Sequence, residues 1–152
     1  MSHKTTELAP EEIPSLSNKE HLATRRGSWR IAGDLPTSLR YAADGLIYGF
    51  SSQRNFQIHV AIGAVVFGLG FWLNLNPTQL SILVLTVAGV LVLELVNTSI
   101  EAVVDLSIGR RFHPLARIAK DCAAAGVLVA AISALVIALL LLIPPLLTQL
   151  GL

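Results

Sequence analysis

One apolar stretch of the chain, residues 80–105, carries a row of side chains that could carry out chemistry. At 100° per residue one narrow stripe of an α-helix would hold Glu94, Thr98, Glu101 and Asp105, with Asn97 at its edge. Carboxylates inside a membrane-spanning helix are costly, so a functional site facing protein or water is their default interpretation. Glu101 could hold a divalent cation, and Glu94, about 10 Å further along the helix, could meet a group at the headgroup boundary.

The next apolar segment begins with Lys120 and Asp121, on the same predicted side of the membrane. A lysine ammonium binds phosphate, and a helix N-terminus favours anions. A metal-binding carboxylate, a phosphate-binding lysine and a carboxylate able to accept a hydroxyl proton together indicate phosphoryl transfer. The chain has no G-x-x-x-x-G-K-[ST] motif and no kinase H-R-D or D-F-G set, which excludes the familiar soluble nucleotide folds.

Spacing alone leaves other interpretations open. Glu94 and Asn97 could form a polar network that locks helices together, and the acids nearer the boundary could be interfacial charges that extend to water. By spacing alone, His59 and His113 are more typical of polar residues that hydrogen-bond within the protein than of metal or nucleotide ligands. The acidic stripe would also suit a small oligomeric proton or ion pathway. Against a continuous relay, only Ser81 and Thr86 are polar in the outer half of this segment.

The composition indicates one small membrane-embedded unit. The chain has 152 residues, of which 53% are hydrophobic and 14% charged, too apolar for an ordinary soluble domain and too short for several domains. The net charge of +1 points to no class of partner, and we expect no nucleic-acid partner. The single Cys122 cannot form an internal disulfide.

The pattern predicts an all-α membrane protein. Residues 1–33 are predicted to be a disordered cytoplasmic tail, and residues 34–152 the membrane domain. An amphipathic surface helix is predicted over residues 37–52, where apolar residues recur at Leu39, Ala42, Ala43, Leu46, Ile47 and Phe50. A polar hinge at residues 51–59 follows it. Three spans are predicted over residues 56–73, 80–104 and 122–143.

The predicted turns separate these spans, and the basic residues orient them. An uncharged turn with Pro77 joins the first two spans, a polar basic loop over residues 107–120 joins the last two, and Pro144-Pro145 is predicted to end the third. All eleven Lys and Arg residues lie before the first span or between the second and the third. The positive-inside rule therefore places the N-terminus and the second loop in the cytoplasm, and the C-terminus outside the plasma membrane.

Two linked segments carry a family resemblance. E94-L-V-N97-T-S-I-E101-A-V-V-D105, followed by H113-P-L-A-R-I-A-K120-D121, resembles the prokaryotic integral-membrane diacylglycerol kinase and undecaprenol kinase family. The resemblance covers roughly residues 37–143. It implies a homotrimer of three-span chains with active sites shared between subunits. It also implies an enzyme that uses ATP and Mg²⁺ to phosphorylate a membrane lipid alcohol, in phospholipid or wall-carrier metabolism.

The resemblance also implies roles for individual positions. Glu94 resembles the catalytic base that acts on the lipid hydroxyl, and Glu101 resembles a metal ligand near the nucleotide. The positions that match the family's ATP-binding residues are Tyr41, Asn97, Glu101, His113, Lys120 and Asp121. The lipid entrance is expected to be lined by Asn55, Phe56, Gln57 and Glu94. The hinge R54-N-F-Q-I-H59 is more similar to the undecaprenol kinase branch, and both substrates are kept open.

One position departs from the family pattern. Where members usually have a glutamate that serves as the second metal ligand, this chain has Gln53. Glutamine keeps an oxygen donor but loses the charge, so we expect Mg²⁺ to be held less tightly or to arrive mainly with ATP. A catalytically impaired family member is therefore an alternative.

Overall fold

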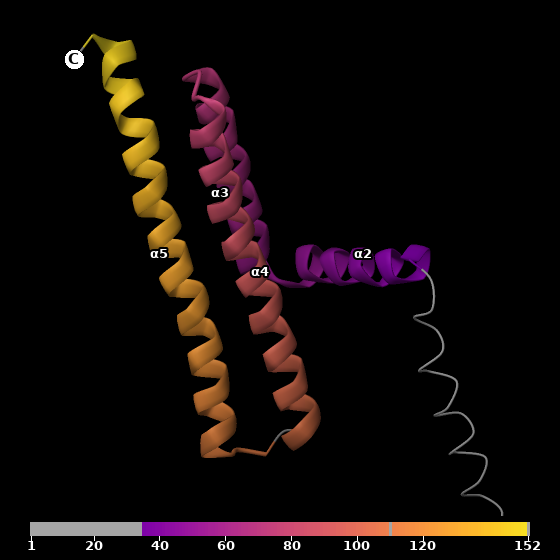
Figure 1. The fold of residues 1–152 in the computed structure, drawn as a ribbon. Coiled ribbons are helices and arrows are strands. Elements are labelled where there is room, and N and C mark those ends of the chain that lie inside the picture. The colour runs from indigo at the N-terminus through magenta and orange to yellow at the C-terminus, as the bar shows by residue number, and fades with distance from the viewer. Residues whose placement is uncertain (1–34, 110, 152) are drawn as a thin grey trace, which may run out of the picture. The chain divides into compact units, whose positions relative to one another are not determined.

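The computed structural model describes residues 35–109 and 111–151, which form helices and short connections and contain no strand (Figure 1). The helices are α2 (Leu35–Ser52), α3 (Arg54–Trp72), α4 (Pro77–Ile108) and α5 (Pro114–Leu150). The predicted all-α fold is therefore confirmed over the described ranges. The prediction of a disordered tail over residues 1–33 lies outside them.

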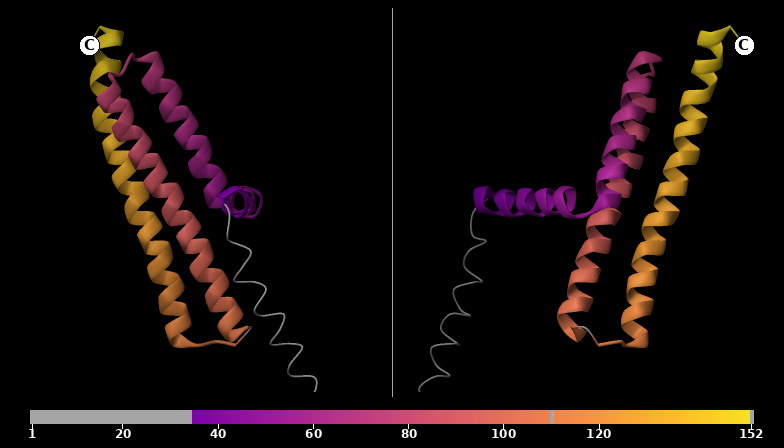
Figure 2. Two further views of the ribbon diagram at one scale, coloured as in Figure 1. Left: turned by 45° about the vertical axis from the view of Figure 1, so that its right-hand side comes forward. Right: turned by 180° about the vertical axis from the view of Figure 1, so that it is seen from behind.

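The chain divides into two units, residues 1–43 and 44–152, and α2 crosses the boundary between them. Within the second unit α4 packs most extensively against α5 and less extensively against α3, while α3 and α5 meet at few points. Figure 2 shows these three helices side by side, with the C-terminus near the end where α3 turns into α4. Helix α4 is thus the central element of this unit.

The three helices differ in length, and this decides what each can position. At 1.5 Å per residue, the 19 residues of α3 span about 28 Å, whereas the 32 residues of α4 span about 48 Å. Because the two helices are joined by a tight turn, α4 extends well beyond the start of α3. Helix α5, with 37 residues, accompanies α4 along this extension.

The turn between α3 and α4 is built from local hydrogen bonds. Asn74 has a positive φ of 53°, a left-handed conformation that asparagine tolerates and that closes the end of α3. Asn76 then caps α4: its Oδ1 accepts from the Gln79 N–H, and Gln79 Oε1 accepts from the Asn76 N–H. Pro77 occupies the first helical position, where its missing N–H costs nothing. This turn fixes the register between α3 and α4.

Small residues allow α3 and α4 to approach closely. A Cβ added at Gly63 would lie 2.8 Å from Val87 Cγ1, so no larger residue fits there without movement. The buried apolar side chains are Phe56, Leu73, Leu75, Leu83, Val90 and Val127. Most other apolar side chains of α3, α4 and α5 are exposed, and these three helices are long and apolar enough to cross a membrane. The predicted spans therefore coincide with helices of the right kind.

Helices α4 and α5 extend beyond the predicted spans, and most of the predicted hinge is helical. Helix α4 begins at Pro77 and continues to Ile108 instead of running over residues 80–104. Helix α5 begins at Pro114, so it includes half of the predicted loop over residues 107–120. The predicted hinge at residues 51–59 is helical except at Gln53. Apolar composition marks the part of a helix that lipid can surround, whereas the backbone hydrogen bonds continue into polar sequence.

The prediction that Pro144-Pro145 ends the third span is wrong. Helix α5 continues through both prolines to Leu150. Prolines remove N–H donors but are tolerated in membrane helices when nearby groups satisfy the freed backbone. The carbonyls freed by the two prolines are those of Leu140 and Leu141, four residues earlier. Gly151, with a φ of 75°, closes the helix after Leu150.

Candidate active site

Glu94 is the buried carboxylate of the second unit. It lies on α4 with a relative exposure of 3%, and its Oε1 has no hydrogen-bond partner. The nearest ionisable partner is His59 on α3, whose Nε2 lies 3.3 Å from Glu94 Oε1 in a geometry that is not that of a hydrogen bond. The Thr98 hydroxyl donates to the backbone carbonyl of Glu94 and leaves the carboxylate free. A buried carboxylate oxygen without a donor is costly unless another group uses it.

Asn97 and Glu101 form a second pair, one turn apart on α4. Asn97 Nδ2 donates to Glu101 Oε1 at 3.1 Å, and both side chains are half-buried. Asn97 Oδ1 is buried and has no hydrogen-bond partner. The pair therefore presents a carboxylate and an unused amide oxygen close together.

Further along α4, the side chain of Asp105 contacts α5. Lys120 Nζ donates to Asp105 Oδ1 at 2.6 Å. Asp121, the neighbour of Lys120, instead faces Arg117 at 3.5 Å in an exposed pair within α5. The structure thus brings Lys120 to the acidic stripe of α4 through Asp105, while Asp121 points to a different partner.

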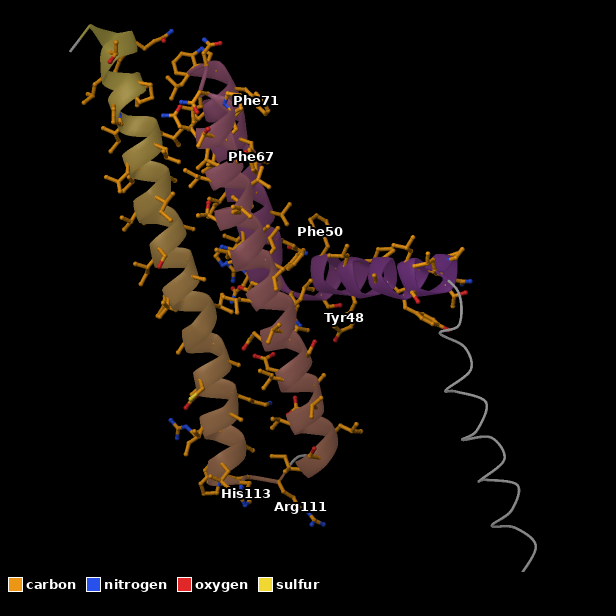
Figure 3. All side chains as sticks on the ribbon, in the orientation of Figure 1. Tyr48, Phe50, Phe67, Phe71, Arg111 and His113 are labelled. Carbon is orange, nitrogen blue, oxygen red and sulfur yellow. The ribbon has the colours of Figure 1, made fainter. Side chains whose placement is uncertain are left out.

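A groove of about 390 Å³ lies where α4 turns into α5. It contains several positive groups and two acids, and it is lined by Val104, Asp105, Ile108, Gly109, Arg111, Phe112, His113, Ala116, Arg117, Lys120 and Asp121. Figure 3 labels Arg111 and His113 at this turn. His113 also caps α5, because its Nδ1 accepts from the Leu115 N–H at 3.3 Å. Three predicted nucleotide-binding residues therefore line one groove.

The segment that begins α3 holds the predicted metal and lipid residues. Gln53 is half-buried at the N-cap of α3, and its side chain makes no capping hydrogen bond. Asn55 is exposed, whereas Phe56 is buried at 5% exposure. Gln57 Nε2 donates to the Phe50 carbonyl at 2.7 Å, which ties the start of α3 to the end of α2. Their proposed contacts with metal or lipid stay predictions.

Tyr41 lies on the part of α2 that belongs to the first unit, and it is 52% exposed. Its predicted place at the nucleotide pocket stays a prediction as well.

Comparison with known proteins decides the family. Residues 40–142, more than half of the chain, match the family described as prokaryotic diacylglycerol kinase. The chain belongs to the prokaryotic diacylglycerol kinase family. It is 47% identical over 124 residues to the diacylglycerol kinase of Synechocystis sp., covering 82% of this chain and 71% of that protein. It is 40% identical over 109 residues to the undecaprenol kinase of Bacillus subtilis, covering 72% of this chain and 88% of that protein.

A less similar relative is also named a diacylglycerol kinase. The chain is 31% identical over 96 residues to the diacylglycerol kinase of Escherichia coli, covering 63% of this chain and 78% of that protein. As a member of the prokaryotic diacylglycerol kinase family with three apolar helices, the chain is a lipid kinase integral to the membrane. The predicted enzyme class is confirmed, and an ion pathway is not favoured.

Two residues of this lipid kinase gained importance only with the structure. Sequence reasoning treated His59 as an ordinary polar residue, yet it is the partner of Glu94. Asp105 was placed on the acidic stripe but given no role, yet it holds Lys120. The signal for His59 was present in the sequence, because an ionisable residue inside a predicted span is expensive and needs a partner.

The polar groups lie in order along α4. Glu94 lies deepest, Glu101 follows about 10 Å further along the helix, and Asp105 with Lys120 follows about 6 Å beyond that. A hydroxyl group at the deep end and a phosphate chain at the α4–α5 turn could therefore approach each other along one helix. In a lipid kinase this order suits transfer between a bilayer lipid and a nucleotide.

Proposed function

We propose that this protein transfers the γ-phosphate of ATP to the hydroxyl group of diacylglycerol, with Glu94 as the general base. The observation that carries the proposal is the buried Glu94 Oε1 without a hydrogen-bond partner. A carboxylate that lacks donors and is excluded from water is suited to take the proton of an incoming hydroxyl. Diacylglycerol comes first because the 47% identical relative is named a diacylglycerol kinase.

The nucleotide phosphates would bind in the groove at the α4–α5 turn. Lys120, Arg111 and His113 supply positive or hydrogen-bonding groups there, and the N-terminus of α5 opens into the same region. Glu101 lies one turn from Asp105, the partner of Lys120, so the terminal phosphate would reach the acidic stripe of α4. Lys120 would bind this phosphate while Glu94 takes the lipid proton.

Magnesium fits the residues beside this groove. Asn97 Oδ1 is buried without a partner and lies beside the Glu101 carboxylate, and oxygen ligands of this kind suit Mg²⁺. The described residues contain no group of three His, Cys, Asp or Glu that could hold a metal alone, so nucleotide phosphates and water would complete the shell. Gln53 would add a neutral oxygen. When bound, the ion offsets negative charge on the phosphates.

The proposal also includes the orientation of the chain in the membrane and its assembly with other copies. We expect the N-terminus and the α4–α5 turn to face the cytoplasm, because the Lys and Arg residues gather there. A homotrimer with shared active sites, as the family resemblance implies, would cover part of the exposed apolar surface of α3, α4 and α5.

Undecaprenol is the second candidate substrate. The undecaprenol kinase of B. subtilis is 40% identical to this chain and matches it over 88% of its own length. Both lipids carry a single primary hydroxyl group at the membrane surface, so the same base and the same phosphate site would serve either one. The choice between them concerns only the apolar part of the substrate.

The test measures transfer of labelled γ-phosphate from Mg·ATP to diacylglycerol or undecaprenol in mixed micelles. Wild type and Glu94→Gln are compared, because glutamine keeps the size of the side chain but cannot accept the proton. We expect transfer to diacylglycerol and a loss of about 10²–10⁴-fold in the variant. Transfer to undecaprenol alone would mean that undecaprenol, and not diacylglycerol, is the substrate. Activity of Glu94→Gln close to that of wild type would contradict the role of Glu94 as the general base.

A further inference from the structure

A proton taken up by Glu94 needs a way out of the protein. The Glu94 side chain is only 4% exposed, so direct release to water is hindered. His59 reaches it from α3, with Nε2 at 3.3 Å from Glu94 Oε1, and its own side chain is 22% exposed. His59 is thus both the nearest ionisable partner of Glu94 and the more accessible of the two.

Among the described residues that line the groove at His59, none is a competing proton acceptor. It lies at a groove of about 310 Å³ between α3, α4 and α5, where it is the one ionisable side chain of the lining. The other polar side chain of the lining, Thr86, directs its hydroxyl to the carbonyls of Ile82 and Leu83 on its own helix. From α4 the group facing His59 is Glu94, and from α5 the groove is lined by alanine, isoleucine and leucine. The next acid on the stripe, Glu101, lies about 10 Å along α4.

We propose that His59 accepts the substrate proton from Glu94 and releases it to water, which returns Glu94 to its carboxylate form after each phosphoryl transfer. The inference rests on the proposed role of Glu94 as the base. It makes His59 a positioning and proton-accepting residue of the lipid kinase that acts through Glu94 and does not touch the phosphates.

The cycle balances in protons and bonds. As the lipid oxygen forms its bond to the γ-phosphorus, the bond from that phosphorus to the β-phosphate oxygen breaks, and Glu94 takes the hydroxyl proton. The resulting carboxylic acid passes this proton to His59 Nε2. The imidazolium then loses its Nε2 proton to water, which restores the Nδ1–H tautomer of His59 and the carboxylate of Glu94. Because Nε2 is the acceptor, resting His59 is neutral and carries its hydrogen on Nδ1.

The test compares wild type, His59→Gln and Thr86→Val in the labelled-phosphate assay, with diacylglycerol and undecaprenol as the lipids. Glutamine is polar and close to histidine in size, but it cannot accept a proton from Glu94. We expect kcat to fall about tenfold to a hundredfold in His59→Gln, while KM for Mg·ATP and for the lipid changes less than twofold. We also expect the solvent deuterium isotope effect on kcat to rise. Thr86→Val alters the same groove away from Glu94 and should match wild type.

The pH profile separates proton transfer from simple packing. In wild type, kcat should fall as the pH is lowered, because a protonated imidazole cannot accept a proton from Glu94. In His59→Gln this low-pH fall should be lost or displaced, whereas a merely structural change would lower kcat equally at every pH. An unchanged kcat together with an unchanged pH profile overturns the proposal.

Two further measurements keep the outcome decisive. If His59→Gln does not fold, His59→Asn takes its place. If neither folds, ring-nitrogen NMR of His59 in Glu94→Gln is compared with wild type, and identical pH dependence of the Nε2 signal overturns the proposal. Glu94→Gln also separates the two ideas. If Glu94→Gln is inactive while His59→Gln behaves as wild type, only the proposal for His59 fails. If Glu94→Gln is active, the proposed role of Glu94 in the function fails as well.

Discussion

Lys120 on α5 donates from its Nζ to Asp105 Oδ1 on α4 at 2.6 Å. The two residues lie 15 positions apart in the sequence, on either side of the α4–α5 turn. The contact holds the ammonium at the rim of the groove where we place the nucleotide phosphates. Asp105 therefore restricts the position of the Lys120 ammonium, the charge that we propose to bind phosphate.

Asp105→Asn should weaken ATP binding through Lys120. Asparagine keeps the shape but removes the charge that holds the ammonium, so Lys120 becomes more mobile. The Asp105 side chain is 60% exposed, and such pairs contribute about 0.2–1 kcal/mol. We therefore expect KM for Mg·ATP to rise by up to about fivefold, with KM for the lipid unchanged. Steady-state kinetics over an ATP series measures this change.

A double-mutant cycle is the control for Asp105. In a Lys120→Met background the ammonium is absent, so Asp105→Asn should have no further effect on KM for Mg·ATP. An equal effect in both backgrounds would mean that Asp105 acts on the nucleotide without Lys120.

Gln53→Glu should lower the Mg²⁺ concentration needed for activity. The substitution introduces the charged oxygen ligand that the family resemblance implies at this position. One added charge in a metal shell should reduce the half-saturating Mg²⁺ concentration by about tenfold, roughly 1.4 kcal/mol. The measurement is initial rate against free Mg²⁺ at fixed ATP. No change in the Mg²⁺ requirement would argue that position 53 is not a metal site in this chain.

Gln79→Glu is the matched control for this charge. Gln79 lies in the first turn of α4, where its Oε1 accepts from the Asn76 N–H, a role that glutamate keeps. It adds the same charge at the end of α4 away from Glu101, so the Mg²⁺ requirement should not move.

The burial of Glu94 could be predicted from the sequence, because a carboxylate within an apolar span must face protein or water. Its pairing with His59 could not. That contact depends on the rotation of α3 about its axis and on the register that the Asn74–Pro77 turn imposes. The apolar residues of α3 lie on all sides of this helix, so the sequence does not show which of its faces packs against α4.

The helix ends show the same limit. Helix α5 begins at Pro114, eight residues before the predicted third span at 122–143. The first two turns of α5 carry three charged residues, Arg117, Lys120 and Asp121, among apolar ones, and the His113 side chain caps their start. Lys120 therefore projects from a helix and not from a loop, and this is what lets it meet Asp105.

Gly63→Ala should destabilise the α3–α4 pair, whereas Gly68→Ala should not. An alanine Cβ at Gly63 would lie 2.8 Å from Val87 Cγ1, while none of the described atoms lies within 4 Å of a Cβ at Gly68. Both changes gain about 1 kcal/mol of helix propensity, but overpacking costs about 1–3 kcal/mol at Gly63. Unfolding by sodium dodecyl sulfate in mixed micelles, followed by circular dichroism, should rank Gly63→Ala below Gly68→Ala. Equal stabilities would contradict the close approach.

The membrane orientation can be tested with the single cysteine of the chain. Cys122 is exposed on α5, two residues after Lys120, so the proposed orientation places it near the cytoplasmic surface. A membrane-impermeant maleimide should label Cys122 in inside-out vesicles and not in right-side-out vesicles. The matched control is Gln149→Cys in a Cys122→Ser background, which moves the thiol to the other end of α5. It should reverse the pattern, and the same sidedness for both thiols would contradict a spanning α5.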